Sequence, residues 1–94
     1  MKFLENPNQT MIAGFAQIEH SIVLYESVHR IERTLMEIAE ALKDQPQRAV
    51  VVCRELTKLH EETVHTTVGA LRGNAQSITK KGEFVVVIGP LRHQ

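Results

Sequence analysis

The clearest pattern in the chain is a stripe of apolar residues at spacings of three and four. The residues in this stripe are Val28, Ile31, Leu35, Ile38 and Leu42. Such spacing places them on one face of a helix, and the hydroxyl of Ser27 is a natural N-cap for it. Asp44-Gln45-Pro46 ends the pattern, because proline disfavours helical geometry in the residue before it. The spacing therefore predicts one helix from Ser27 to about residue 43.

Four short apolar or β-branched segments predict strands. They are Ser21–Tyr25, Arg48–Cys53, Thr63–Val68 and Phe84–Ile88. The second is continuously apolar, so we expect both of its faces to be covered. Gly89-Pro90 ends the last segment.

The remaining segments give weaker signals. Residues 1–10 are polar and carry Pro7, and are predicted to be a loose lead-in. A short helix is expected over Met11–Glu19, although Gly14 weakens it by about 1 kcal/mol relative to alanine. Val68–Leu71 is predicted to make one helical turn, followed by a polar loop over Gly73–Lys80.

This order of elements predicts an α/β fold with a mixed sheet of about four to five strands and flanking helices. A helix between two apolar strands is typical of a crossover connection. The Thr63–Val68 and Phe84–Ile88 strands are expected as antiparallel edges. With no repeat or linker, residues 1–20 are expected to form a lead-in and short helix, and residues 21–94 a single lobe.

Composition narrows the class of protein. Ninety-four residues with 43% hydrophobic content are enough for one small globular domain. The formal net charge is zero, so any contact with nucleic acid must be local. The single cysteine, Cys53, excludes an internal disulfide and fits a reducing compartment. No apolar run reaches the length of a membrane span and no signal-peptide pattern opens the chain, which predicts a cytoplasmic protein.

Two candidate catalytic patterns are weak. His60 and His65 are five residues apart, which on a helix separates them by roughly 140° and not by the single turn that a zinc site needs. We therefore expect no metal. Cys53 ends an apolar run and is more simply a small buried side chain than a nucleophile. The five glycines fit no nucleotide-binding pattern.

The Arg54-Glu55-Leu56-Thr57-Lys58 segment is the better candidate for a binding site. It follows the predicted Arg48–Cys53 strand, and open α/β sheets bind ligands beyond the carboxyl ends of their strands. An ordinary solvated loop remains the alternative from composition alone. Lys80-Lys81 and Arg72 are likewise either phosphate contacts or plain surface. Glu26, His29 and Arg30 either orient a ligand or pair with one another.

Three motifs, in order, resemble a known family. Tyr25-Glu26-Ser27-Val28-His29-Arg30 resembles its Phe-Tyr-Glu-Ser-Pro-His-Arg junction, with Val28 in place of proline. Arg54–Lys58 followed by His60-Glu61-Glu62 is similar to its Arg-Glu-Leu-Thr-Lys motif, and residues 81–90 resemble its closing Gly-Glu, apolar strand and Gly. The family is ribosomal RNA small subunit methyltransferase I, within the tetrapyrrole (corrin/porphyrin) methylases.

The resemblance implies a fold and a function. It implies the C-terminal lobe of a two-lobed, homodimeric enzyme that methylates a cytidine ribose 2′-oxygen in 16S ribosomal RNA, with S-adenosylmethionine as donor. The N-terminal lobe of such enzymes has no counterpart in these 94 residues, so we expect the chain alone to be inactive. The alternatives are a non-catalytic binding or dimerisation module, or a methylase of a tetrapyrrole macrocycle.

Roles for individual residues follow from the resemblance as expectations. Glu55, Leu56 and Thr57 are expected to contact the donor, and no catalytic base can be assigned. RNA phosphate is expected to meet Arg30, Lys58 and Lys81. Glu26 and Ser27 are expected to fix the strand-to-helix junction.

Overall fold

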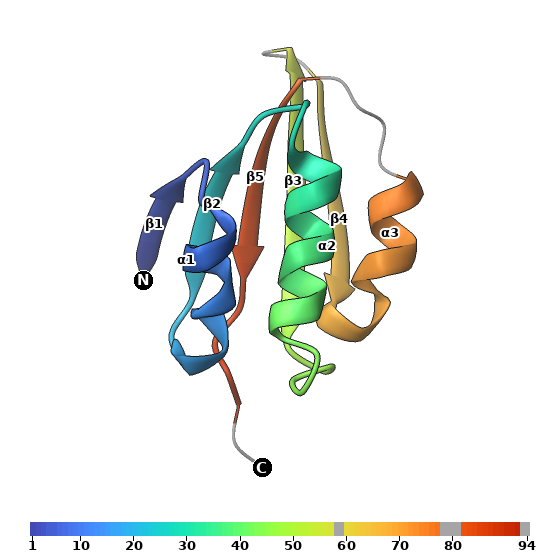
Figure 1. Cartoon of the computed structure of the whole chain (residues 1–94). Helices are drawn as coiled ribbons and strands as arrows, with labels where there is room; N and C mark the ends of the chain where they lie inside the picture. Colours follow the sequence, from blue (N-terminus) through green and yellow to red (C-terminus); the bar gives the residue numbers. More distant parts are fainter. Residues whose placement is uncertain (58–59, 78–81, 93–94) are drawn as a thin grey trace.

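A five-stranded mixed sheet carries helices on one face, as Figure 1 shows for the computed structural model. The structure describes residues 1–57, 60–77 and 82–92. The strands are β1 (Lys2–Glu5), β2 (Ile22–Glu26), β3 (Ala49–Thr57), β4 (His60–Thr67) and β5 (Glu83–Ile88). The helices are α1 (Gln9–Ala13), α2 (Ile31–Ala41), α3 (Leu71–Ser77) and two 3-10 turns, Phe15–Gln17 and Val68–Ala70. The predicted fold class is confirmed.

The order of strands in the sheet is β1-β2-β5-β3-β4. Strands β2 and β3 are both antiparallel to β5, so they run parallel to each other and α2 connects them as the predicted crossover. The expectation that β5 lies at an edge is wrong, because it is inserted between the two strands of that crossover. Strand β4 pairs antiparallel with β3 at the edge, as predicted.

Residues 2–5 correct the prediction of a loose lead-in. They form β1, which pairs parallel with β2, with Lys2 opposite Ile22. The helix expected over Met11–Glu19 is also wrong in its bounds: α1 ends at Ala13 and a separate 3-10 turn follows Gly14. Strand β1 was not predicted because an edge strand of four residues gives little apolar periodicity. Its polar neighbours and Pro7 favoured a loop instead.

Helix α2 begins later than predicted. Its N-cap is Arg30, not Ser27, and the Ser27 side chain makes no cap. The Ser27 carbonyl instead accepts from the backbone N–H groups of Arg30 and Ile31, at 3.1 and 3.0 Å, and closes a turn before the helix. The predicted apolar stripe is confirmed from Ile31 to Leu42, whereas Val28 precedes the helix and packs at the margin of the core.

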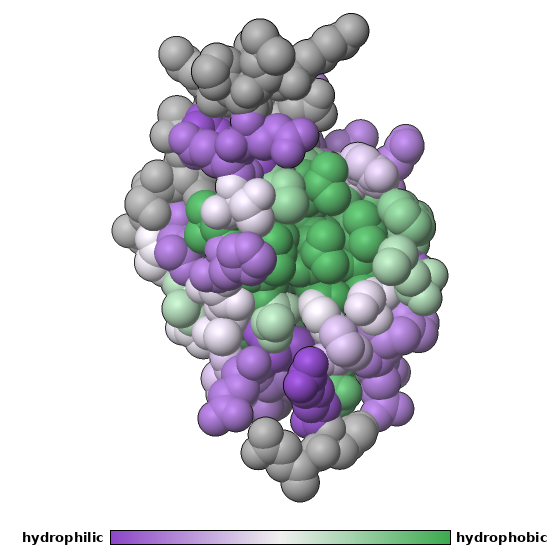
Figure 2. Space-filling view, turned by 180° about the vertical axis from the view of Figure 1, so that it is seen from behind, coloured by the Kyte–Doolittle hydropathy of each residue, from purple (hydrophilic) through white to green (hydrophobic). Residues whose placement is uncertain are grey.

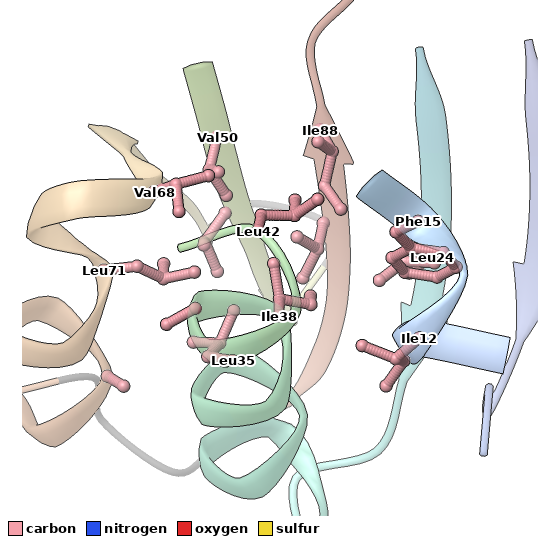
Figure 3. Close-up of a cluster of buried hydrophobic side chains, with 14 of the residues drawn as sticks. Ile12, Phe15, Leu24, Leu35, Ile38, Leu42, Val50, Val68, Leu71 and Ile88 are labelled. Atoms are coloured by element: carbon pink, nitrogen blue, oxygen red, sulfur yellow. The ribbon is translucent and has the colours of Figure 1, made fainter. Parts of the chain in front are cut away.

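The core lies between the sheet and the helices. Figure 3 shows Leu35 and Ile38 of α2, and Leu42 just after it, between the α1 segment on one side and Val68 and Leu71 on the other. Helix α3 replaces the polar loop expected over Gly73–Lys80 as far as Ser77, and residues 78–80 lie outside the described ranges. Leu71 and Ala75, four residues apart, are both buried. No helix in the described ranges has the length and apolar character needed to cross a membrane.

The end of the sheet at the start of β3 is closed around Arg48, which is 4% exposed. Its guanidinium donates to the carbonyls of Gly89 (2.8 Å), Ile18 (2.8 Å) and His20 (3.1 Å), and to Gln45 Oε1 (3.0 Å). Burial lowers the pKa of Arg48 from its usual value through desolvation. This one side chain therefore ties the loop before β2 and the turn after α2 to the end of β5.

Candidate functional site

The opposite end of the sheet brings together the first two sequence motifs and the start of the third, at Glu83 and Phe84. Because β2 and β3 run parallel, their carboxyl ends lie at the same end of the sheet, which the entry to α2 also reaches (Figure 1). The Tyr25–Arg30 junction and the Arg54–Thr57 segment therefore lie at this end, although 23 or more residues separate them in sequence. We call it the open end, in contrast to the end closed around Arg48.

A row of polar and aromatic residues crosses the sheet at the open end. Strand register places Phe84 opposite both Glu26 and Arg54, and Arg54 opposite Glu62. Glu26, Phe84 and Arg54 are all buried on the face that the helices cover. The row thus alternates a carboxylate, a ring, a guanidinium and a second carboxylate over four neighbouring strands.

Glu26 is fully engaged at the strand-to-helix junction. Its side chain is 2% exposed. One carboxylate oxygen accepts from the Ser27 backbone N–H at 2.9 Å and the other accepts from the Thr34 hydroxyl at 2.7 Å. The expectation that Glu26 and Ser27 fix this junction is consistent with these bonds, and the carboxylate also anchors α2 through Thr34.

Arg54 is the second buried charge of the row. It is 6% exposed, and its guanidinium forms an ion pair with Glu62 of β4 at 2.5 Å, where the Glu62 side chain is 59% exposed. A carboxylate partner lowers the cost of burying a cation. Arg54 therefore holds the β3–β4 hairpin while its partner stays accessible to solvent.

The Arg54–Thr57 segment continues the sheet, so the solvated loop that composition left open as an alternative is wrong for these residues. Residues to Thr57 extend β3, and pairing with β4 resumes at His60. The register passes from Glu55 opposite Glu61 to Thr57 opposite His60, an irregularity that leaves Leu56 without a register partner. Bulges of this kind re-aim the chain and are common beside binding sites.

The structure shows where some of the predicted site residues lie, and their roles stay predictions. The backbones of Glu55, Leu56 and Thr57 lie together on β3 at the open end. Lys58 and Lys81 lie outside the described residues. Arg30 is half-buried at the same end, and its guanidinium donates to the Pro7 carbonyl at 3.2 Å, so part of its donor capacity serves the loop after β1.

Two partners in this region were missed by sequence reasoning. Thr34 lies beside Leu35 on the buried face of α2. Buried hydroxyl groups are nearly always hydrogen-bonded, so a threonine at this position indicates a buried acceptor nearby, which is Glu26. Glu62 is opposite Arg54 on the neighbouring strand, a pairing that sequence spacing does not indicate. In the described part of the chain, no three His, Cys, Asp or Glu side chains gather as metal ligands.

Of three surface depressions in the described part of the chain, only one lies near the row. One, lined by Val28, His29, Glu32, Arg33 and Met36, runs along the first half of α2 next to the open end. Another lies between α1, α2 and α3, and a third surrounds the turn at Gln45 and Pro90 at the closed end. None of these three is lined by Arg54, so they do not form a closed donor pocket around the predicted segment.

Comparison with known proteins identifies the class. The family described as Tetrapyrrole (Corrin/Porphyrin) Methylases matches residues 3–72, and the chain belongs to this family. Its structure is similar to that of the cobalt-precorrin-4 methyltransferase CbiF, with a TM-score of 0.71 and 15% identity over 94% of this chain and 39% of that one. It is also similar to uroporphyrin-III C-methyltransferase of Thermus thermophilus in complex with S-adenosylhomocysteine, with a TM-score of 0.62 and 13% identity over 94% and 40% of the two chains.

Curated relatives give a narrower likeness within the family. Ribosomal RNA small subunit methyltransferase I of Synechocystis sp. is 38% identical over 86 residues, which cover 87% of this chain and 29% of the relative. The Bacillus subtilis protein of the same name is 39% identical over 70 residues, or 74% of this chain and 23% of the relative. The chain thus spans less than a third of the length of these two relatives.

Proposed function

We propose that this chain is the C-terminal lobe of an S-adenosylmethionine-dependent methyltransferase that modifies a cytidine ribose 2′-oxygen of 16S ribosomal RNA. The observation that carries the proposal is the likeness to relatives named ribosomal RNA small subunit methyltransferase I, which reaches 38% identity over 86 residues. The structural neighbours named for precorrin-4 or uroporphyrin III are only 13–15% identical and support the fold alone. The likeness in sequence therefore favours RNA over a tetrapyrrole as substrate.

The open end of the sheet is the proposed donor-binding wall. The irregular register at Leu56 interrupts the β3–β4 ladder, and backbone amides and carbonyls at such a point suit the edge of an adenine base. Glu55, Leu56 and Thr57 are proposed to contact the donor from β3. The buried Glu26 and Arg54 hold the surrounding strands in place, so this wall is rigid before a ligand arrives.

Transfer of a methyl group from a sulfonium is an in-line displacement, and the donor supplies its reactive carbon. The protein must hold the ribose oxygen on the face opposite sulfur, exclude water and provide a route for the departing hydroxyl proton. The residues proposed to orient RNA phosphate are Arg30, Lys58 and Lys81. The remaining two-thirds of the enzyme would complete the donor site, so we expect no measurable methyl transfer from this chain alone.

We further propose that the enzyme is cytoplasmic and works as a homodimer. Methylation of ribosomal RNA requires access to the small ribosomal subunit or its precursor, and the single cysteine is compatible with a reducing compartment. The division into residues 1–20 and 21–94 becomes a proposal about the boundary of the lobe. Strand β1 extends the same sheet across that boundary.

A chimaera tests the activity directly. This chain would replace the matching segment of the Synechocystis relative, and methyl transfer from labelled S-adenosylmethionine to small ribosomal subunits would be measured, with the modified nucleotide mapped. We expect methylation of a cytidine 2′-oxygen, and a loss of donor affinity of about tenfold in Thr57→Ala, equivalent to about 1.4 kcal/mol.

Thr63→Ala is the matched control, because Thr63 is an exposed residue of β4 outside the proposed wall. Unchanged donor affinity in both Thr57→Ala and Leu56→Ala would refute the donor assignment. Transfer to a tetrapyrrole but not to RNA would establish the macrocycle alternative. A chimaera that folds, binds small ribosomal subunits and transfers no methyl group would indicate a non-catalytic module.

A further inference from the structure

The loop after β1 lies at the open end of the sheet, beside the strand-to-helix junction. Strand β1 pairs parallel with β2, which runs parallel to β3, so the carboxyl ends of all three strands lie at this end (Figure 1). The loop consists of Asn6, Pro7 and Asn8, and we call it the Asn6 loop. It therefore lies at the edge of the sheet where open α/β folds bind their ligands.

Two hydrogen bonds hold the Asn6 loop against the strand-to-helix junction. The backbone N–H of Asn6 donates to the Tyr25 carbonyl at 2.9 Å. Pro7 is buried, and its carbonyl accepts from the Arg30 guanidinium at 3.2 Å. Asn6 has a φ of 45°, in the left-handed region that few residues other than glycine and asparagine adopt. Backbone conformations of this kind persist where surrounding contacts fix them, and they cluster at functional sites.

The side-chain amide of Asn6 is available to bind a ligand. It is exposed and makes no hydrogen bond to the residues that the structure describes, whereas the Asn8 side chain caps α1. An amide carries a hydrogen-bond donor beside an acceptor. The edge of a pyrimidine base carries a complementary pair, which for cytosine is the N4 amino group and N3. Asn6 can therefore form two hydrogen bonds to one base of a single-stranded RNA.

Arg30 places a cation beside this amide. Its bond to the Pro7 carbonyl uses one of the five N–H donors of the guanidinium. The other donors can bind the phosphate next to a base that Asn6 holds. Phosphate contacts position a nucleic acid and base contacts identify it, so the two side chains together supply both parts of nucleotide recognition.

The rest of the sheet is less suited to RNA. The face opposite the described helices is apolar over its middle, where Val85 and Val87 lie, and hydrophilic residues gather toward its ends (Figure 2). The Asn6 loop and Leu56 follow or lie on strands three spacings apart, or about 14 Å. A nucleotide at the loop and a donor at Leu56 would thus approach each other from opposite sides of the open end, as in-line transfer requires.

We propose that the Asn6 loop binds the RNA substrate, with the Asn6 amide on the edge of a pyrimidine base and Arg30 on the adjacent phosphate. The proposal rests on the proposed function and gives its RNA substrate a base-reading residue. Arg30 then has two roles, because the same guanidinium holds the loop in place through Pro7.

Nuclear magnetic resonance of the 94-residue chain, titrated with a short single-stranded RNA rich in cytidine, tests the contact. We expect the side-chain NH₂ signals of Asn6 to shift as RNA is added. Asn6→Gly should weaken RNA binding about tenfold, equivalent to about 1.4 kcal/mol, because glycine keeps the left-handed backbone and removes the amide. Gln47→Ala is the matched control, since Gln47 is an exposed amide in the turn at the closed end, and it should bind RNA as the parent chain does.

Asn6→Asp is a second variant that also tolerates the left-handed backbone. It replaces the amide donor by a carboxylate that repels phosphate, so it should weaken RNA binding at least as much as Asn6→Gly. Asn6 signals that do not shift at millimolar RNA would overturn the proposal, as would equal RNA affinity in the parent chain and both variants. If S-adenosylhomocysteine shifts the Asn6 signals and RNA does not, the loop contacts the donor instead, and the proposal is likewise wrong.

Kinetics of the chimaera separate this proposal from the proposed function. Asn6→Gly should raise the KM for small ribosomal subunits about tenfold and leave the affinity for S-adenosylmethionine unchanged. A chimaera that methylates RNA with the same KM in both forms would contradict the role of the loop and leave the proposed function standing. RNA that shifts the Asn6 signals of the chain, with no methyl transfer by the chimaera, would do the reverse.

Discussion

The two ends of the sheet both bury charged side chains, but they satisfy them differently. At the closed end, Arg48 donates to four oxygen acceptors that all belong to neighbouring loops and turns. At the open end, Glu26 bonds the entry of α2 and Arg54 pairs with a carboxylate that remains in solvent. The polar groups of the closed end hydrogen-bond to one another, whereas the open end leaves the carboxylate of Glu62 exposed to solvent. This contrast is one reason for proposing the open end as the ligand-binding part of the lobe.

The largest expected effect comes from the closed end. Arg48→Met should lower the free energy of unfolding by about 2–4 kcal/mol, because it leaves three backbone carbonyls without a donor. Urea denaturation would measure the change. Arg33→Met is the control, since Arg33 is a largely exposed side chain whose pair with Glu37 contributes at most about 0.5 kcal/mol.

The pH dependence of the Arg48 effect has a definite sign. Desolvation lowers the pKa of Arg48 in the folded state, so burial of the cation opposes folding at every pH below that value. This cost is relieved only as the pH rises through the folded-state pKa, on the alkaline side. We therefore expect the difference between the parent chain and Arg48→Met to be constant across neutral pH, as paired urea titrations would show.

Glu26→Gln should have the next largest effect, about 1–2 kcal/mol of stability. The variant places an amide nitrogen where the carboxylate now accepts from either Ser27 or Thr34. Glu40→Gln, at an exposed ion pair with Lys43, should change stability by less than about 0.5 kcal/mol. Equal losses in the two variants would show that the junction contributes no more than a surface pair.

Thr34→Val tests the same junction from the side of α2. It removes the hydroxyl that donates to Glu26 at 2.7 Å and keeps the shape of the side chain, with an expected loss of about 1–2 kcal/mol. A double-mutant cycle with Glu26→Gln should show losses that are clearly non-additive. Thr63→Val on the exposed surface of β4 serves as the control, and additive losses at residues 26 and 34 would refute their coupling.

Two glycines give the smallest effects, of opposite sign. Gly82 has a φ of 85°, so Gly82→Ala should destabilise the chain by about 1 kcal/mol. Gly73 lies inside α3 with open space around its Cα, so Gly73→Ala should stabilise it by about 0.5–1 kcal/mol. Thermal unfolding of both variants checks the signs.

Much of the fold could be predicted from the sequence where packing sets a period. The apolar stripe of α2 and the apolar runs of β3 and β5 could be predicted because these positions are buried in the core. The inserted position of β5 was missed, although a run of five apolar residues at Phe84–Ile88 is typical of a central strand, while an edge strand usually alternates. β1 and α3 were missed because each is short, and the tertiary contacts that stabilise them leave no local pattern.

The candidate site was predictable only in part. The motifs indicated Tyr25–Arg30 and Arg54–Thr57 as important segments, and the crossover brings them to one end. That Arg54–Thr57 continues a strand could not be read from the sequence, because its polar residues conceal the ladder with β4. The partners Thr34 and Glu62 depend on which strands are neighbours, and sequence spacing does not contain that information.

Amide hydrogen exchange of the chimaera with and without S-adenosylhomocysteine tests the central claim most directly, because it reports both ends of the sheet in one experiment. We expect the ligand to slow exchange at residues 26–30 and 54–57 of the open end and to leave residues 45–48 and 89–91 of the closed end unchanged. Protection confined to the closed end, or none in either region while the ligand binds, would contradict the assignment of the open end as a wall of the donor site.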